Sequence, residues 1–159
     1  MSDNKSKYSP AVIGYLNAIS EFFGSTITPN EDDCINLAVE NENPVTIHID
    51  MDKEQFDLFS IVADELPDPI DYSLVQDLLD YALSPFVDGG PAVGRDPQTG
   101  FLEAYVILPF KNMSPAEFIE ALKEFIKFQI AISHRIAENS ENEAESSASM
   151  PETFISMEV

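Results

Sequence analysis

The sequence predicts a single α+β domain in which a twisted antiparallel sheet packs with helices, in the order α-β-β-β-α-β-β-α. Two observations support this fold class. Three segments place apolar residues at helical spacing, and five shorter segments have the length and apolar pattern of strands. The chain also has 159 residues and is 44% hydrophobic, which suffices for one domain with a core of its own.

The first helix is expected between Ser9 and Gly24. Serine followed by Pro10 is typical of a helix N-terminus, because serine caps the first turn and proline is tolerated there. Apolar residues then recur at spacings of four, three and four, at Val12, Leu16, Ile19 and Phe23. Gly24 ends the helix. We expect residues 1–8 to form a flexible N-terminus.

Three strands are expected next. Two of them, joined by the Asn-Glu-Asn-Pro turn at residues 41–44, should form a hairpin. Their apolar positions alternate with other residues and are Ile35, Leu37 and Val39, then Val45, Ile47 and Ile49. The third strand, residues 56–62, is apolar on both faces. One face carries Phe56, Leu58, Ser60 and Val62, and the other carries Asp57, Phe59 and Ile61.

Leu66-Pro67-Asp68-Pro69 must interrupt regular structure, because proline lacks a backbone donor and restricts the residue before it. The segment that follows has apolar residues at helical spacing, at Leu74, Val75, Leu78, Leu79, Ala82 and Leu83. We expect Pro85 and the loop at residues 89–91 to end this helix. Two strands, 92–95 and 101–108, then flank a tight turn at residues 96–100.

The last helix begins with a capping box, Ser114-Pro115-Ala116-Glu117, and should run to about Ala137. Its apolar residues form two adjacent stripes, a wider face than a surface helix needs. The stripes are Phe118, Leu122, Phe125, Ile132 and Ile136, and Ile119, Ile126 and Ile130. The sequence therefore predicts a domain at residues 9–137. Residues 138–159 are expected to be an acidic, disordered tail with an apolar end.

The 29 acidic residues against 8 basic residues give a net charge of −21. This charge repels nucleic acid and anionic membranes, so we expect neither as a partner, whereas a basic or poorly soluble protein would fit. No apolar run is long enough to span a bilayer, and residues 1–24 lack the pattern of a signal peptide. A single cysteine, Cys34, agrees with a reducing compartment. We therefore expect a cytoplasmic protein.

The residues that most often carry chemistry form no recognisable site. His48 and His134 have no matched ligands, and Cys34 has no evident base to activate it. Residues 50–61 begin like a calcium-binding loop, but Gln55 stands where that loop needs glycine and Ile61 where it needs glutamate. The sequence therefore predicts no enzyme, no cofactor and no metal site.

The order of elements includes a Gly-rich loop before the fourth strand and a turn at residues 96–100 before the fifth. Four short motifs accompany this order: Phe22-Phe23-Gly24, Cys34-Ile35-Asn36-Leu37, Leu78-Leu79 and Thr99-Gly100-Phe101-Leu102. Together they resemble the family of type III secretion effector chaperones called Tir-chaperone or CesT-like. The resemblance covers residues 9–137.

The resemblance implies a homodimer in the bacterial cytoplasm that binds the N-terminal region of one or more secreted effectors. Such a chaperone keeps its client soluble and competent for secretion, and it catalyses nothing. Apolar surface beyond what one small domain can bury agrees with this function. The candidate effector-binding residues are Ile13, Leu16, Ile47, Phe59 and Ile61. The candidate dimer residues, near the family's twofold axis, are Leu79, Leu83, Val93 and Tyr105.

Several alternatives stay open in the sequence. The face with Phe59 and Ile61 either binds a client or is covered by helices of the same chain. The apolar residues of the first helix are core residues or are partly exposed to a client. The apolar end, residues 150–159, either docks on a third protein, such as a component of the secretion apparatus, or folds back on the domain. Other possible functions are a regulatory or interaction module of the same fold and an acidic mimic of nucleic acid.

Overall fold

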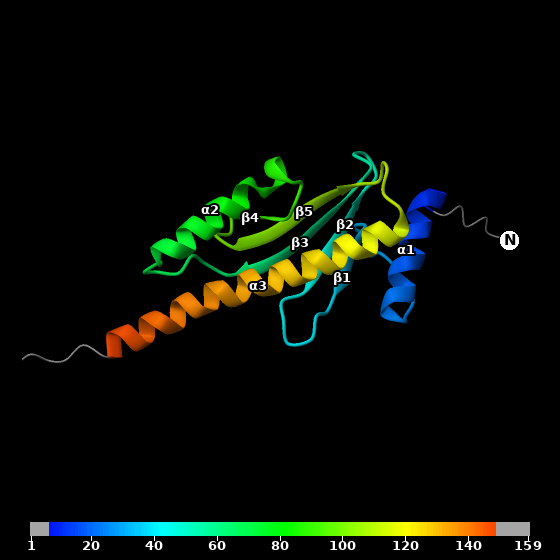
Figure 1. Ribbon diagram of the computed structural model, residues 1–159. Coiled ribbons are helices and arrows are strands. Elements are labelled where there is room, and N and C mark those ends of the chain that lie inside the picture. The colour runs from blue at the N-terminus through cyan, green and yellow to red at the C-terminus, as the bar shows by residue number, and fades with distance from the viewer. Residues whose placement is uncertain (1–6, 149–159) are drawn as a thin grey trace, which may run out of the picture.

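The computed structural model describes residues 7–148 of the chain, with side chains as far as residue 141. Within this range the chain forms three helices and five strands in the predicted order, which confirms the predicted α+β fold class (Figure 1). The helices are α1 (Pro10–Phe23), α2 (Tyr72–Val87) and α3 (Pro115–Ala148). The strands are β1 (Cys34–Leu37), β2 (Val45–Asp50), β3 (Gln55–Ala63), β4 (Ala92–Arg95) and β5 (Leu102–Pro109).

The strands form one antiparallel sheet in the order β1-β2-β3-β5-β4. The long central strand β3 pairs with β5, so that Phe59 lies opposite Tyr105 and Asp57 lies opposite Ile107. The edge strands β1 and β4 have only four residues each. Because successive side chains of a strand point to opposite faces, this register decides which residues share a face.

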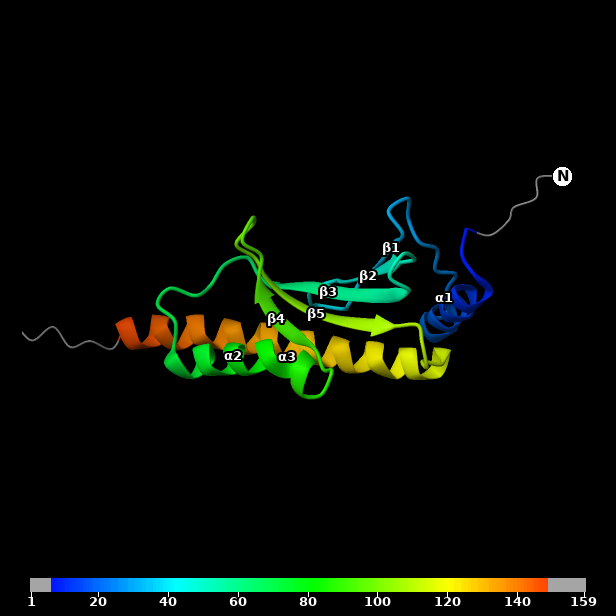
Figure 2. The ribbon, with the colours of Figure 1, turned by 90° about the horizontal axis from the view of Figure 1, so that it is seen from above.

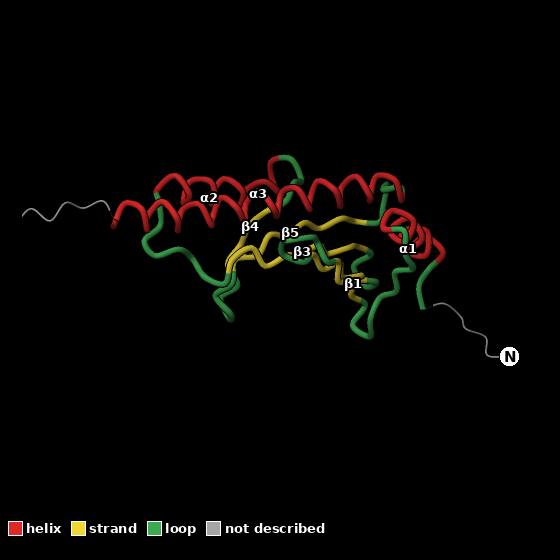
Figure 3. The backbone as a smooth tube through the Cα atoms, turned by 90° about the horizontal axis from the view of Figure 1, so that it is seen from below, coloured by secondary structure: helices red, strands yellow, loops and turns green. Residues whose placement is uncertain are grey.

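The described helices all lie against the same face of the sheet. Figures 2 and 3 show α2 and α3 side by side along this face, with α1 near one end of α3. The core fills the space between sheet and helices, and its fully buried members include Val12, Ile19, Val45, Ile47, Phe56, Leu58, Leu74, Phe118, Leu122 and Phe125. No described helix covers the other face. The alternative in which helices of the same chain also cover the face with Phe59 and Ile61 is therefore wrong for the described residues.

α1 has the predicted caps and is fixed by an aromatic cluster. The Val12 amide donates to Ser9 Oγ at 3.4 Å, and Gly24 closes the helix at φ 65°. The ring of Tyr15 lies 5.1 Å from that of Phe56 on β3, and its hydroxyl donates to the carbonyl of Phe110 at 3.2 Å. The middle of α1 is thereby tied to the sheet and to the loop before α3.

The chain just before α1 is also attached, although we expect a flexible segment there. Lys7 Nζ lies 2.6 Å from Asp33 Oδ1, and the hydroxyl of Tyr8 donates to the same carboxylate. Within the expected flexible segment of residues 1–8, Lys7 and Tyr8 are therefore held against the loop before β1.

α3 begins at the predicted capping box, in which the Ser114 amide donates to Glu117 Oε2 at 2.7 Å and the Glu117 amide to Ser114 Oγ at 3.2 Å. We expect this helix to end near Ala137, but it continues to Ala148. A helix that has already formed extends at little cost through residues such as Ala and Glu, so acidic composition alone does not end it. The expected apolar end, residues 150–159, lies outside the described residues.

The buried side chain of Asn139 holds this extension of α3 to the domain. Its Oδ1 accepts from the Asp71 amide at 2.8 Å, and its Nδ2 donates to the carbonyl of Pro69 at 3.3 Å. The segment before α2 is therefore hydrogen-bonded to α3 beyond residue 137.

α2 continues past Pro85, where we expect it to end, and stops at Val87. Proline removes one backbone hydrogen bond from the last turn. Because this turn is exposed to solvent, the loss costs little free energy.

Smaller differences concern the strand ends. β1 stops at Leu37, which leaves Val39 outside the strand, and β5 begins at Leu102. None of the helices described is long and apolar enough to cross a membrane.

Candidate protein-binding surface

The sheet face without a helix carries an apolar patch on its two central strands. We call Phe59 and Ile61 of β3 together with Tyr105 and Ile107 of β5 the open-face patch. Ile61 is 40% exposed, Tyr105 is 38% exposed and Ile107 is 51% exposed. Phe59 lies opposite Tyr105 and is partly buried. The buried side chains of β3 and β5 point to the other face of the sheet, where the core lies. The open-face patch is therefore not part of the core.

Charged side chains surround the patch. Asp57 lies opposite Ile107, and Glu103 lies opposite Ile61. Together with Lys53, Gln55 and patch residues, they line a shallow depression of about 340 Å³. An extended peptide could lay apolar side chains on the patch and basic side chains on its rim.

The same face becomes polar towards the β1 edge of the sheet. His48 Nδ1 lies 3.2 Å from Asp57 Oδ2, and Gln55 Nε2 donates to Asp57 Oδ1 at 2.6 Å. Thr46 Oγ1 donates to Asn36 Oδ1 at 2.9 Å. These side chains bind one another, so the apolar part of the face is confined to β3 and β5.

α2 presents a second apolar surface. Leu74 is the one residue of this helix that is fully buried, whereas Leu79, Leu83, Phe86 and Val87 are 59–89% exposed. We call these four residues the α2 surface. Between α2 and β4 lies a groove of about 440 Å³ with almost entirely apolar walls, which include Leu78, Leu79 and Val93. A surface helix normally faces solvent with polar residues, so α2 exposes more apolar surface than an ordinary surface helix does.

The candidate effector-binding residues are not all on one surface. Phe59 and Ile61 lie on the open face, where we expect them. Ile47 does not: it is fully buried on the helix-covered face, because it alternates with Thr46 and His48 along β2. Its assignment to an exposed effector-binding surface is wrong. Ile13 and Leu16 on α1 are partly buried, and Leu16 packs against the core.

The four candidate dimer residues are divided between the two faces of the sheet. Leu79 and Leu83 belong to the α2 surface. Val93 is only 6% exposed and lies on the same side as the helices, opposite Ala104. Tyr105 points to the open face, beside Phe59. The structure therefore brings Tyr105 together with the effector-binding candidates and not with Leu79.

Sequence reasoning missed three exposed members of these surfaces. Ile107 continues the alternation of Tyr105 along β5 and could have been found from that spacing. Phe86 and Val87 follow Pro85, where the sequence predicts the end of the helix. They were therefore not expected to belong to an apolar helix surface.

Two observations on the described residues concern metal binding and the single cysteine. The described residues contain no cluster of three or more side chains able to hold a metal ion. Burial, followed by the carboxylates of Asp32 and Asp33, raises the pKa of the Cys34 thiol, so the reactive thiolate is disfavoured.

Comparison with known proteins extends this description. No family model matches the sequence, and no curated protein sequence matches it. Solved structures do match. A chain of the HopA1-SchA chaperone-effector complex superposes with a TM-score of 0.66 at 20% identity, over 78% of this chain and 94% of that one.

The chain has the fold of type III secretion chaperones. A chain of the ExsC-ExsE complex gives a TM-score of 0.64 at 15% identity, over 79% of this chain and 92% of the other. The third example is the Yersinia pestis type III secretion chaperone SycH in complex with a fragment of YscM2. It gives a TM-score of 0.58 at 14% identity, over 74% of this chain and 96% of that one. At these identities the likeness establishes the fold.

Proposed function

We propose that this protein is a bacterial cytoplasmic chaperone for type III secretion. It binds the N-terminal region of one or more effectors and keeps that region soluble and competent for secretion, and it catalyses no reaction. The observation that carries the proposal is the open-face patch, which is apolar and uncovered by any described helix. The fold shared with chains of chaperone-effector complexes supports the same function.

An extended, partly unfolded segment of the effector suits this surface. Its apolar side chains would cover Phe59, Ile61, Tyr105 and Ile107, which removes apolar area from water in both proteins. Its backbone can also pair with an edge strand such as β1, which gives affinity with little demand on sequence. The net charge of −21 keeps the free chaperone soluble and speeds capture of a basic segment.

Two copies of the chain associate in this proposal through the α2 surface. Leu79 and Leu83 are 63% and 59% exposed, and Phe86 is 89% exposed, so α2 leaves most of its apolar area in water in a single copy. A twofold contact between two such helices would bury the same residues of both copies at once.

Light scattering tests the proposal. The purified protein is measured alone and after co-expression with the N-terminal region of each candidate secreted protein from the same organism. We expect a dimer of roughly twice the 17.6 kDa chain mass, which copurifies with at least one such fragment and solubilises it. A monomer that captures none of the fragments would contradict both parts of the proposal.

Two matched variants separate the surfaces. Ile107→Asn places a polar group in the open-face patch and should weaken client binding about tenfold while the dimer remains, because central apolar contacts dominate such interfaces. Leu79→Asn on α2 should instead shift the protein towards monomer. Calorimetric titration with a captured fragment and light scattering measure the two effects. Equal loss of client binding in both variants would show that the surfaces do not act separately.

A further inference from the structure

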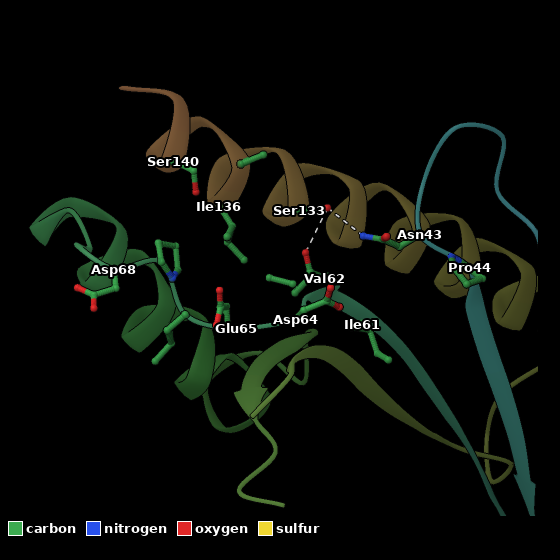
Figure 4. A pocket seen from close by; sticks show the side chains of 14 residues that line it. Asn43, Pro44, Ile61, Val62, Asp64, Glu65, Asp68, Ser133, Ile136 and Ser140 are labelled. Carbon is green, nitrogen blue, oxygen red and sulfur yellow. Dashed lines mark hydrogen bonds between the residues drawn. The ribbon is translucent and has the colours of Figure 1, made fainter. Parts of the chain in front are cut away.

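A large groove lies at the end of β3, beside the extension of α3. It has a volume of about 890 Å³, and its walls come from the β1–β2 loop, the end of β3, the segment before α2 and one side of α3 (Figure 4). Its lining residues are Asn43, Pro44, Ile61, Val62, Ala63, Asp64, Glu65, Leu66, Pro67, Asp68, Ser133, Ile136, Ala137 and Ser140. A space of this size holds several side chains of a peptide.

Hydrogen bonds between distant segments hold the groove in shape. At one end, Ser133 Oγ accepts from Asn43 Nδ2 at 3.0 Å and donates to the carbonyl of Val62 at 3.4 Å, which joins α3, a loop and β3 (Figure 4). At the other end, Asn139 binds Pro69 and Asp71 as described above. The groove therefore depends on the part of α3 beyond residue 137.

The lining combines an apolar base with acidic walls. Val62 and Ile136 are each 5% exposed and form the base, and Figure 4 shows Ile136 directed from α3 towards the loop that carries Glu65. Asp64, Glu65 and Asp68 supply three carboxylates, and the described lining includes no lysine or arginine.

The arginine of α3 pairs with carboxylates other than those of Asp64, Glu65 and Asp68. Arg135 is turned to α2, where its Nε lies 3.1 Å from Asp77 Oδ2. The other ion pairs among the described residues also involve carboxylates outside the groove. The groove therefore favours a positively charged occupant.

The groove is continuous with the open-face patch and with the apolar groove between α2 and β4. Ile61 belongs to the open-face patch and also lines the groove. Leu66, which is 41% exposed, lines the groove and also the space between α2 and β4. A segment lying on the open-face patch reaches the groove at Ile61 without crossing a covered region.

Charge argues against occupants from the chain itself. Residues 149–159 contain Glu152 and Glu158 and no base, so the acidic walls would repel them. A second copy of the chain brings 29 acids and only 8 bases. A client of basic character has no such disadvantage.

We propose that the groove binds a basic segment of the client in which an arginine or lysine stands next to apolar residues. The proposal rests on the chaperone function above. The methylene groups of the basic side chain lie along Val62, Leu66 and Ile136, and its charged end pairs with Asp64 and Glu65. The groove thereby selects clients by charge, while the open-face patch accepts apolar segments of many sequences.

Nuclear magnetic resonance of the ¹⁵N-labelled full chain tests this with defined probes. The probes are acetyl-Val-Arg-Leu-Arg-Val-amide and the same peptide with citrulline, which has the shape of arginine without its charge. We expect shifts of the amide signals of residues 63–66, 68 and 133–140, and binding of the arginine peptide roughly three- to tenfold tighter than that of the citrulline peptide. The preference should fall as salt rises.

The double variant Asp64→Asn and Glu65→Gln should abolish the preference. Its matched control is the double variant Glu31→Gln and Asp32→Asn, which changes an exposed acidic pair away from the groove. This control should retain the preference for the arginine peptide. Equal affinity for the two peptides, or shifts confined to the open face, would overturn the proposal. So would a change in the groove signals when residues 149–159 are removed before any peptide is added, because the chain's own end would then be the occupant.

This test is independent of the client. If light scattering finds an effector complex and the peptides do not distinguish arginine from citrulline, the groove assignment fails and the chaperone function stands. If the peptides bind as expected and no effector is captured, the groove is a basic-peptide site and the chaperone function fails.

Discussion

The two faces of the sheet are built from the same strands and differ in burial. On the covered face, Phe56 and Leu58 are fully buried under the helices. On the open face, Ile61 and Ile107 are 40% and 51% exposed, and the acidic residues Asp57 and Glu103 lie at the two ends of the apolar patch. Adjacent residues of β3 therefore belong alternately to the core and to a surface.

This difference determines how much each face contributes to the stability of the fold. Core residues must fill a closed space, so each substitution there leaves a cavity. Residues of the open face can change without such a cost, so this surface can vary while the fold is preserved. The acids on the open face also oppose self-association of the apolar patch.

The largest expected effect compares chemically matched residues of β3. Leu58→Ala on the covered face should lower the free energy of unfolding by roughly 2–5 kcal/mol. Ile61→Ala on the open face, which removes a side chain of the same carbon number, should cost no more than about 1 kcal/mol. Urea unfolding followed by circular dichroism measures both. A similar cost at the two positions would mean that the open face is covered in solution.

The next effect concerns the attachment of α2 and its preceding segment to α3. Asn139→Ala leaves the Asp71 amide and the Pro69 carbonyl without their side-chain partner, which should cost about 1–3 kcal/mol. Ser140→Ala, on the exposed side of the same turn, is the control and should be nearly neutral. Urea unfolding gives the free energies. If Asn139→Ala is also neutral, the extension of α3 does not stabilise the covered face.

The smallest effect is a pH dependence at the end of the covered face near α1. Hydrogen bonds from Lys7, and then from Tyr8, lower the pKa of Asp33 in the folded protein. The ionised Asp33 carboxylate therefore stabilises the folded protein at pH values above the pKa of about 4 that it has in the unfolded chain. This stabilisation is lost as the pH falls through the lower pKa of the folded protein. Asp33→Asn should flatten the loss of stability below about pH 4 compared with the native chain and with the control Asp52→Asn. Identical acid unfolding curves would disprove the contribution.

Parts of the candidate site could be predicted from the sequence. The alternation in residues 56–62 placed Phe59 and Ile61 on the face opposite Leu58, and this is how they lie. The same rule, applied to β2, would have excluded Ile47, which shares the covered face with Leu58, its partner in the register. The division of Val93 and Tyr105 between the two faces depended on the register of β4 with β5, which the sequence does not contain.

The sequence by itself determined the elements and their order, because apolar spacing, caps such as Ser9 and Ser114, and turns act over a few residues. Only the tertiary structure decided that the described helices share one face of the sheet and that α3 continues past Ala137. It also decided that a groove forms between α3 and the segment before α2. These features depend on contacts between residues far apart in the chain, such as Asn139 with Asp71 and Ser133 with Asn43. Local patterns carry no information about which distant segments meet, and that pairing placed the surfaces of this protein.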